Sequence, residues 1–192
     1  MTAIAQGVTN YEYMFFYVAQ ALVFVTPILT MRMFAEERKN GTEILLVTSP
    51  KTTTGIVLGK FFAAVMVIVI MEICTIAYFG ILCYFQMPEI MVGIITLLGV
   101  LILAMSYISF GMLISTITEN QIIAGIITLG LLIAMWFLPS INQSLASFSL
   151  LERFYNFPQG FISIPDLTVL ISTTIVFILI TIILMERRKI LK

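Results

Sequence analysis

Long apolar runs without a charged residue limit what this chain can fold into. Tyr13–Met31 and Leu167–Met185 each hold nineteen residues without a charge, and Ile90–Thr118 holds twenty-nine. A helix of about twenty apolar residues crosses the hydrocarbon core of a bilayer. The chain is 60% hydrophobic and 10% charged, whereas a soluble domain is about half apolar and a quarter charged. We therefore expect an all-α, polytopic membrane bundle.

The runs predict five membrane-spanning helices within a single domain, residues 1–192. A cluster of Tyr and Phe at the start of the first span is typical of the membrane interface. Pro27 lies inside that span and can bend it, and Pro139 is expected to end the fourth. The expected spans are about 13–33, 59–85, 92–115, 122–138 and 167–185.

Residues 140–166, between the last two spans, are too polar to cross a membrane and too apolar for a free linker. They contain aromatic residues and one basic residue, Arg153. We expect an interfacial region with a surface helix over Gln143–Tyr155. It is either a plain loop or a helix that gates an exit.

A polar segment separates the first two spans. Met31–Lys60 holds five of the ten basic residues and three of the ten acidic residues. We expect the first helix to continue through Arg32–Lys39 and to stop at Asn40–Gly41, since both residues tolerate the left-handed conformation. Thr42 is a candidate N-cap for a short helix. Residues Thr52–Thr54 are expected to cap the next span.

The apolar stretch Ile44–Val47 makes this segment, residues 34–58, a candidate docking surface. A run of charges alone is usually a solvated helix end. A short apolar ridge between charged residues instead needs a partner or a lipid surface to cover it. Lys60 is expected to reach from the second span to the membrane surface.

The basic residues predict the orientation of the chain in the membrane. With five spans, nine of the ten basic residues lie on one side and only Arg153 on the other. Basic residues favour the cytoplasmic side. We therefore expect residues 34–58 and the C-terminus in the cytoplasm, the N-terminus and residues 140–166 outside, and the protein in the inner (cytoplasmic) membrane of a bacterium.

Glu72 is a carboxyl group near the middle of the second span. An ionisable group at this depth is a candidate functional residue, because burial of its charge is costly. It has three interpretations: a substrate or proton path, a wet dimer interface, or a structural hydrogen bond to Ser106, Tyr107 or Thr75. The two cysteines, Cys74 and Cys83, lie in the same apolar span. We interpret them as small hydrophobic residues.

The sequence argues against several functional classes. It contains no His, no GxSxG motif and no phosphate-binding loop, because Phe61 follows Gly59-Lys60 where that loop needs Ser or Thr. Glu72 alone does not supply both acid and base for an intramembrane enzyme. An ion-coupled carrier and a membrane assembly or scaffold protein remain alternatives to an ATP-driven exporter.

Several short motifs in and around the polar segment occur in a fixed order and spacing. Together they resemble the same region of ABC-2 type transporter permeases, and within them the gliding-motility-associated and copper-nitrous-oxide-maturation branches. The turn Ser115–Ala124 and the ending Gly160–Lys189 resemble that family too. The motifs are Pro27-Ile28-Leu29-Thr30-Met31-Arg32, Glu36-Glu37-Arg38, Gly41-Thr42, Leu45-Leu46, Thr48-Ser49-Pro50 and Gly59-Lys60.

This resemblance implies a six-helix subunit that pairs with an identical or related permease. It implies that the polar segment holds a coupling helix that docks on a separate ATP-binding subunit, where ATP and Mg²⁺ bind, so that this chain binds no cofactor itself. The family's substrates include lipids, polysaccharides, drugs and peptides. The implied coupling residues are Glu36, Glu37, Arg38, Gly41, Thr42, Glu43, Leu45, Leu46 and Pro50.

The sequence departs from the family pattern at two points. The family places an acid two residues after the Gly-Thr pair, where this chain has Ile44; its own acid is Glu43, one position earlier. The first membrane helix of the family is also missing. We therefore expect that the sequence is truncated or that its start is misplaced.

Overall fold

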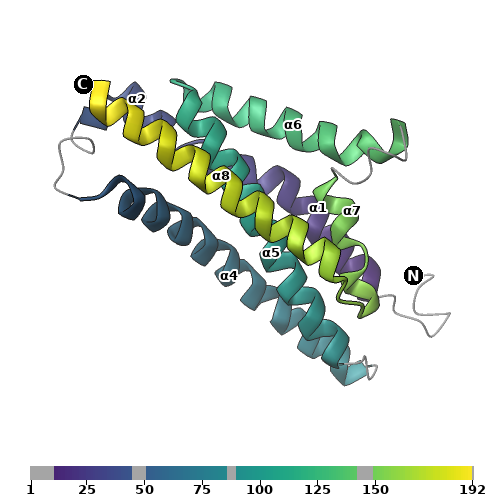
Figure 1. Cartoon of the computed structure of the whole chain (residues 1–192). Coiled ribbons are helices and arrows are strands. Elements are labelled where there is room, and N and C mark those ends of the chain that lie inside the picture. The colour runs from purple at the N-terminus through teal and green to yellow at the C-terminus, as the bar shows by residue number, and fades with distance from the viewer. Residues whose placement is uncertain (1–10, 45–50, 86–89, 142–148, 192) are drawn as a thin grey trace.

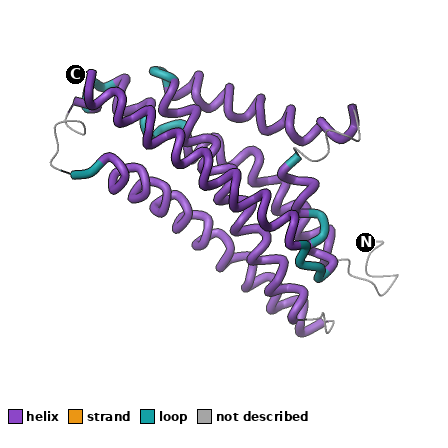
Figure 2. Tube along the Cα trace, viewed as in Figure 1, coloured by secondary structure: helices purple, strands orange, loops and turns teal. Residues whose placement is uncertain are grey.

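A computed structural model describes residues 11–44, 51–85, 90–141 and 149–191. These residues form helices, turns and loops and contain no strand (Figure 2). Among them, five helices are long and apolar enough to cross a membrane. The predicted all-α membrane bundle is confirmed.

Five long helices and three short ones make up the described chain. The long helices are α1 (Tyr11–Thr30), α4 (Thr53–Phe85), α5 (Ile90–Ile117), α6 (Gln121–Ile141) and α8 (Ile164–Leu191). The short ones are α2 (Ala35–Lys39), α7 (Leu150–Phe154) and the 3₁₀ turn η3 (Phe157–Gln159).

Helix α5 is the centre of the bundle. It packs against α1, α4, α6 and α8 (Figure 1). Small residues let its neighbours approach closely, as is usual between membrane helices. A Cβ added at Gly111 would overlap the side chain of Thr30 in α1, and one added at Gly99 would lie 2.7 Å from the ring of Phe157 in η3.

Polar contacts join α5 to α8 inside this apolar bundle. The Ser106 hydroxyl donates to the carbonyl of Leu170 at 2.8 Å and lies 3.0 Å from the Thr174 hydroxyl. One helical turn further, the rings of Phe110 and Phe177 meet edge to face, with centroids 5.2 Å apart. These contacts fix the register of the two helices.

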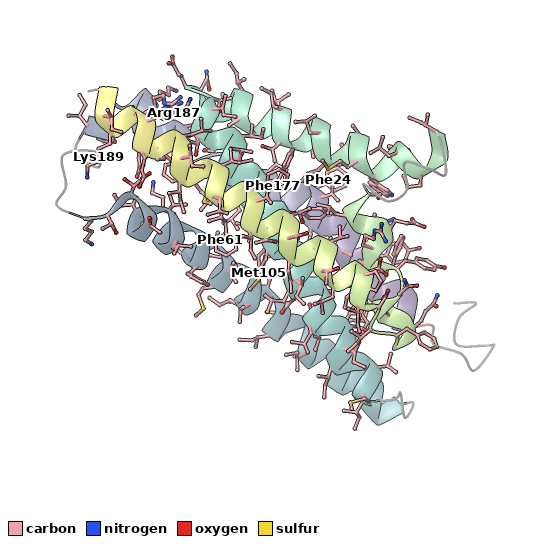
Figure 3. All side chains as sticks on the ribbon, viewed as in Figure 1. Phe24, Phe61, Met105, Phe177, Arg187 and Lys189 are labelled. Carbon is pink, nitrogen blue, oxygen red and sulfur yellow. The ribbon has the colours of Figure 1, made fainter. Side chains whose placement is uncertain are left out.

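The turns and short helices lie at the two ends of the bundle (Figure 2). One end, which we call the basic end, consists of residues 32–44, 51–60, 116–121 and 186–191. Arg187 and Lys189 lie there, at the same end as α2 (Figure 3). The opposite end consists of α7, η3 and the first turns of α5 and α8. Except for Arg153 at the opposite end, every basic residue in the described part of the chain lies at the basic end.

The structure corrects two predicted helix ends. The first helix does not continue through Arg32–Lys39, because residues 31–34 form a turn between α1 and α2. Pro139 does not end α6, which runs on to Ile141. A proline lacks only one backbone donor, and the helix needs few further hydrogen bonds so close to its end.

Other predictions concern caps and the polar region between α6 and α8. Thr52 does cap α4, since its hydroxyl accepts the Gly55 N–H at 3.2 Å. Gly41, with a φ of 71°, adopts the left-handed conformation expected after α2. Of the surface helix expected over Gln143–Tyr155, α7 is present, and residues 142–148 lie outside the described chain.

Candidate functional site at the basic end

The turn between α1 and α2 is held by one side chain of α5. The Ser115 hydroxyl accepts the backbone N–H groups of Phe34 and Ala35, each at 3.1 Å. It donates to the carbonyl of Met31 at 3.3 Å. These donors would otherwise bond within a continuous helix, so Ser115 explains why α1 and α2 are separate. The start of α2 is therefore attached to the end of α5.

Arg38 attaches the end of α2 to the end of α5. Its guanidinium donates to the carbonyls of Thr116 at 2.5 Å, Ile117 at 3.1 Å and Thr118 at 3.2 Å. The last carbonyls of a helix lack partners within the helix and form the negative end of its dipole. A guanidinium with five donors suits this position. Arg38 therefore caps the C-terminus of α5.

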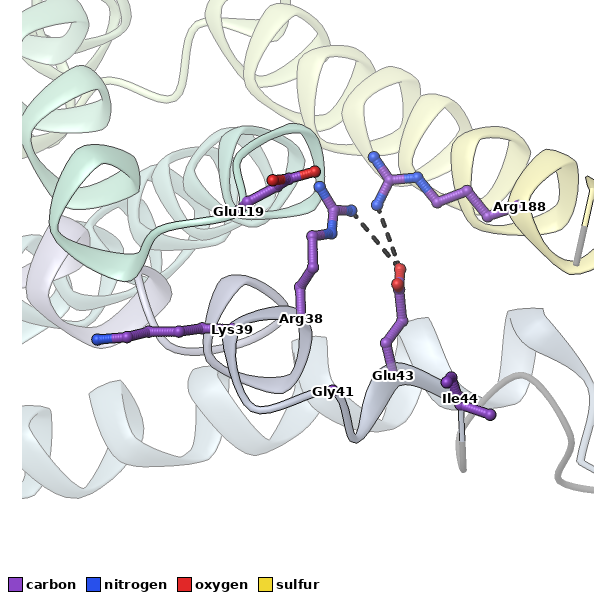
Figure 4. A pocket seen from close by; sticks show the side chains of 7 residues that line it. All are labelled: Arg38, Lys39, Gly41, Glu43, Ile44, Glu119 and Arg188. Carbon is purple, nitrogen blue, oxygen red and sulfur yellow. Dashed lines mark hydrogen bonds and ion pairs between the residues drawn. The ribbon is translucent and has the colours of Figure 1, made fainter.

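Glu43 connects this cap to α8. Its carboxylate lies 3.6 Å from the Arg38 guanidinium and 3.3 Å from that of Arg188 (Figure 4). Glu43 is only 8% exposed, so both arginines approach a carboxylate that is largely shielded from water. Glu43, which directly follows Gly41-Thr42, thus contacts both α2 and α8, through Arg38 and Arg188.

A pocket of about 550 Å³ opens beside these charges. Arg38, Glu43 and Arg188 line it together with Lys39, Gly41, Ile44 and Glu119 (Figure 4). Ile44 is 56% exposed beside the ion pairs of Glu43. The pocket is therefore mixed in character, with charges from three parts of the chain and an apolar rim.

Glu37 and Lys60 form a second link at this end. Their charged groups lie 2.5 Å apart. Lys60 also donates to the carbonyl of Met33 and lies 4.3 Å from the centre of the Phe34 ring. The lysine expected at the membrane surface thus attaches α4 to the turn before α2.

The predicted coupling residues are only partly brought together. Arg38, Gly41 and Glu43 line the basic-end pocket, Glu37 pairs with α4, and Glu36 is half-buried on α2. The Thr42 hydroxyl donates to the carbonyl of Glu37 at 3.2 Å. The remaining predicted residues, Leu45, Leu46 and Pro50, lie outside the described chain.

Three residues of this site were missed as site residues by sequence reasoning. Ser115 and Arg188 were noted only within segments that resemble the family, and Lys60 only within a motif and as a residue at the membrane surface. Two features of the sequence could have indicated them. Ser115 is a polar residue at the end of an apolar helix, and Lys60 and Arg188 are basic residues at the ends of apolar runs. Neither signal names the partner of a given side chain.

Glu72 does not make the hydrogen bonds that were expected. Its Oε1 atom is buried and has no hydrogen-bond partner among the described residues. Ser106 instead faces α8, and the Thr75 hydroxyl donates to the carbonyl of Met71 at 3.4 Å. The predicted structural hydrogen bonds from Glu72 to Ser106 and to Thr75 are therefore wrong.

The opposite end holds a smaller polar cluster. Arg153 of α7 donates to Asp166 of α8 at 2.7 Å, and the Asn156 side chain donates to the same carboxylate at 2.8 Å. Asp166 is 5% exposed. The cluster fastens α7 and η3 to the first turn of α8. No group of three or more His, Cys, Asp or Glu residues that would hold a metal ion occurs in the described ranges.

The sequence matches a known protein family over most of its length. The family model described as "ABC-2 family transporter protein" matches residues 3–185, nearly the whole chain. No curated protein matches the sequence.

Proposed function

Because this chain belongs to the ABC-2 family of transporter proteins, we propose that it is the membrane-spanning permease subunit of an ATP-driven exporter. In this proposal a separate subunit binds and hydrolyses ATP with Mg²⁺. That subunit docks at the basic end and moves the membrane helices. The motifs around the polar segment also favour the gliding-motility or nitrous-oxide-maturation branch.

The network around Glu43 carries this proposal. Residues Gly41–Ile44 are mostly at the surface, yet Glu43 among them contacts both Arg38 and Arg188. Arg38 in turn holds the last carbonyls of α5. A displacement of the segment by a docked partner would therefore act on α5 and α8 together. Helices α5 and α8 pack extensively against each other, and α5 also contacts α1, α4 and α6. The motion would therefore reach the other helices of the bundle.

The surface beside this network suits a protein partner. Ile44 and Thr42 are exposed, and Lys39 and Asn40 precede them at the end of α2. An apolar residue ringed by polar ones is a frequent arrangement at protein interfaces. Glu37 is less available to a partner than the sequence suggested, because its carboxylate pairs with Lys60.

The distribution of charge supports a cytoplasmic position for this surface. The basic end carries nearly all described basic residues, as expected of the cytoplasmic side. The outer faces of the long helices are apolar, for example at Met66, Ile70 and Ile126. They suit contact with lipid and with a second permease subunit, identical or related, which we include in the proposal.

Co-purification of an ATP-binding subunit tests the proposal. The full chain would be expressed together with the genes that flank its own, extracted in mild detergent and purified. We expect a protein with a phosphate-binding loop to accompany it. Ile44→Glu should lower the amount recovered about tenfold, because it places a charge on the apolar part of the interface, whose burial unpaired is costly.

The matched control is Ile164→Glu. Ile164 is 74% exposed and lies at the opposite end, in the first turn of α8. This variant should retain the ATP-binding subunit at the wild-type level. Equal loss in both variants, or equal retention, would contradict docking at the basic end.

A further inference from the structure

A pocket of about 200 Å³ lies within the bundle between α1, α4 and α5. Apolar residues from Val18 to Val25 of α1 form one wall, Val100 of α5 closes it, and Ile68, Met71, Glu72 and Thr75 of α4 form the other wall. Among the described residues that line it, Glu72 is the one titratable residue. The pocket is separate from the site at the basic end.

No described residue donates a hydrogen bond to the buried oxygen of Glu72 in this pocket. Its Oε1 atom is buried without a partner in the described part of the chain. Thr75, the other polar residue of the lining, donates its proton to the carbonyl of Met71. A carboxylate only accepts hydrogen bonds, and burial without a donor is costly at this depth. A donor would satisfy this oxygen, and a cationic donor would suit it best, since charged hydrogen bonds are about twice as strong as neutral ones.

The size of the pocket and the side on which it opens limit which ligands it can hold. Ala21 and Met71 are exposed at the pocket's rim, so the pocket opens on the side that faces lipid. An apolar cavity of about 150 Å³ accommodates a benzene molecule, and this one is slightly larger. It admits a short alkyl or aryl group next to the carboxyl, while a longer chain would extend into the bilayer.

We propose that this pocket binds lipophilic amines. The ammonium group donates to Glu72, and the apolar part packs between α1 and α4. This binding site goes beyond the proposed coupling to an ATP-binding subunit and does not require it. A ligand from the bilayer would enter sideways, past Ala21 and Met71.

Binding of n-octylammonium to the full chain in neutral phosphatidylcholine nanodiscs tests the proposal, with n-octanol as the uncharged compound of equal length. We expect octylammonium to bind about tenfold to a hundredfold more tightly than octanol, the usual effect of a hydrogen bond to a charged group. A second readout is modification of Glu72 by dicyclohexylcarbodiimide, measured by mass spectrometry. Octylammonium should protect Glu72 from this reagent.

Three variants make the test specific. Glu72→Gln should remove the preference for octylammonium and leave octanol binding unchanged. Thr75→Val, a matched change in the same wall, should keep the preference, since the Thr75 hydroxyl bonds within its own helix. Ala21→Phe fills the rim of the pocket and keeps the carboxyl group, and it should lower the affinity for octylammonium at least about tenfold. It replaces Glu72→Gln as the test if that variant does not fold.

Several results would overturn the proposal. One is equal affinity for octanol and octylammonium, and another is unchanged binding in Glu72→Gln or Ala21→Phe. A third is a Glu72 that neither reacts with the carbodiimide nor binds octylammonium, because the pocket would then be covered by a second subunit. Loss of the ATP-binding subunit in the co-purification experiment would leave all of these outcomes unaffected, so the two proposals fail separately.

Discussion

Ser115 shows how much one side chain does at the basic end. Its hydroxyl satisfies two backbone N–H groups and one carbonyl of the turn between α1 and α2. It is completely buried, so water does not replace it. Its loss would leave these backbone groups without partners, at a cost of about 1–3 kcal/mol for a buried unsatisfied group.

We therefore predict that Ser115→Ala lowers the free energy of unfolding by about 2–3 kcal/mol. Thermal unfolding of the purified chain in one detergent measures the effect. Ser172→Ala is the control, because the Ser172 hydroxyl is exposed and bonds only within α8. It should change the stability by less than about 0.5 kcal/mol. Equal effects in both variants would show that the turn does not depend on Ser115.

The packing of α5 depends on two glycines that face other elements. The Gly111 position touches Thr30 of α1, and the Gly99 position touches Phe157 of η3. In both cases the neighbour is itself buried. Since a close-packed interior has little room to adjust, α1 and η3 would have to move away from α5 to admit a methyl group.

We expect Gly111→Ala and Gly99→Ala each to lower stability by about 1–3 kcal/mol through overpacking. Gly130→Ala in α6 is the matched control, because nothing lies within 4 Å of the methyl group it would add. That variant should be neutral or gain up to about 1 kcal/mol from the higher helix propensity of alanine. Unfolding midpoints of the three variants in the same detergent would decide. A Gly111→Ala variant as stable as Gly130→Ala would refute the contact with Thr30.

The whole molecule carries an unequal distribution of charge between its ends. Arg187 and Lys189 lie at the basic end (Figure 3), whereas Phe161, 69% exposed, lies at the opposite end between η3 and α8. The apolar length of the five long helices separates the two sets. If the basic end is cytoplasmic, these positions differ in their access to reagents outside the cell.

Cysteine labelling tests this orientation. In a background with Cys74→Ser and Cys83→Ser, Phe161→Cys should react with a membrane-impermeant maleimide in intact cells. Lys189→Cys should react only after lysis, because the positive-inside rule places it in the cytoplasm. The reverse pattern would show that the basic end lies outside the cell, where a cytoplasmic ATP-binding subunit does not reach it.

Features that depend on neighbouring residues were predictable. Charge-free runs predicted the five long helices, Asn40–Gly41 predicted a helix end where α2 ends, and Thr52 predicted the start of α4. That α2 is separate from α1 was not predicted. The prediction at Pro139 failed because a proline near a helix end costs little, so its position within the helix matters more than its presence.

The sequence by itself determined that this chain is a helical membrane protein with its basic residues gathered at one end, because length, hydrophobicity and local caps act within a few turns. Only the tertiary structure decided which groups meet. Glu43 and Arg188 are 145 positions apart, and Arg38 reaches the end of α5 only because the helices pack as they do. Within the described part of the chain, the same packing leaves Oε1 of Glu72 without a donor in an apolar pocket, although Ser106 lies on a neighbouring helix. Such contacts depend on the relative placement of whole helices, which the periodicity of a single helix does not contain.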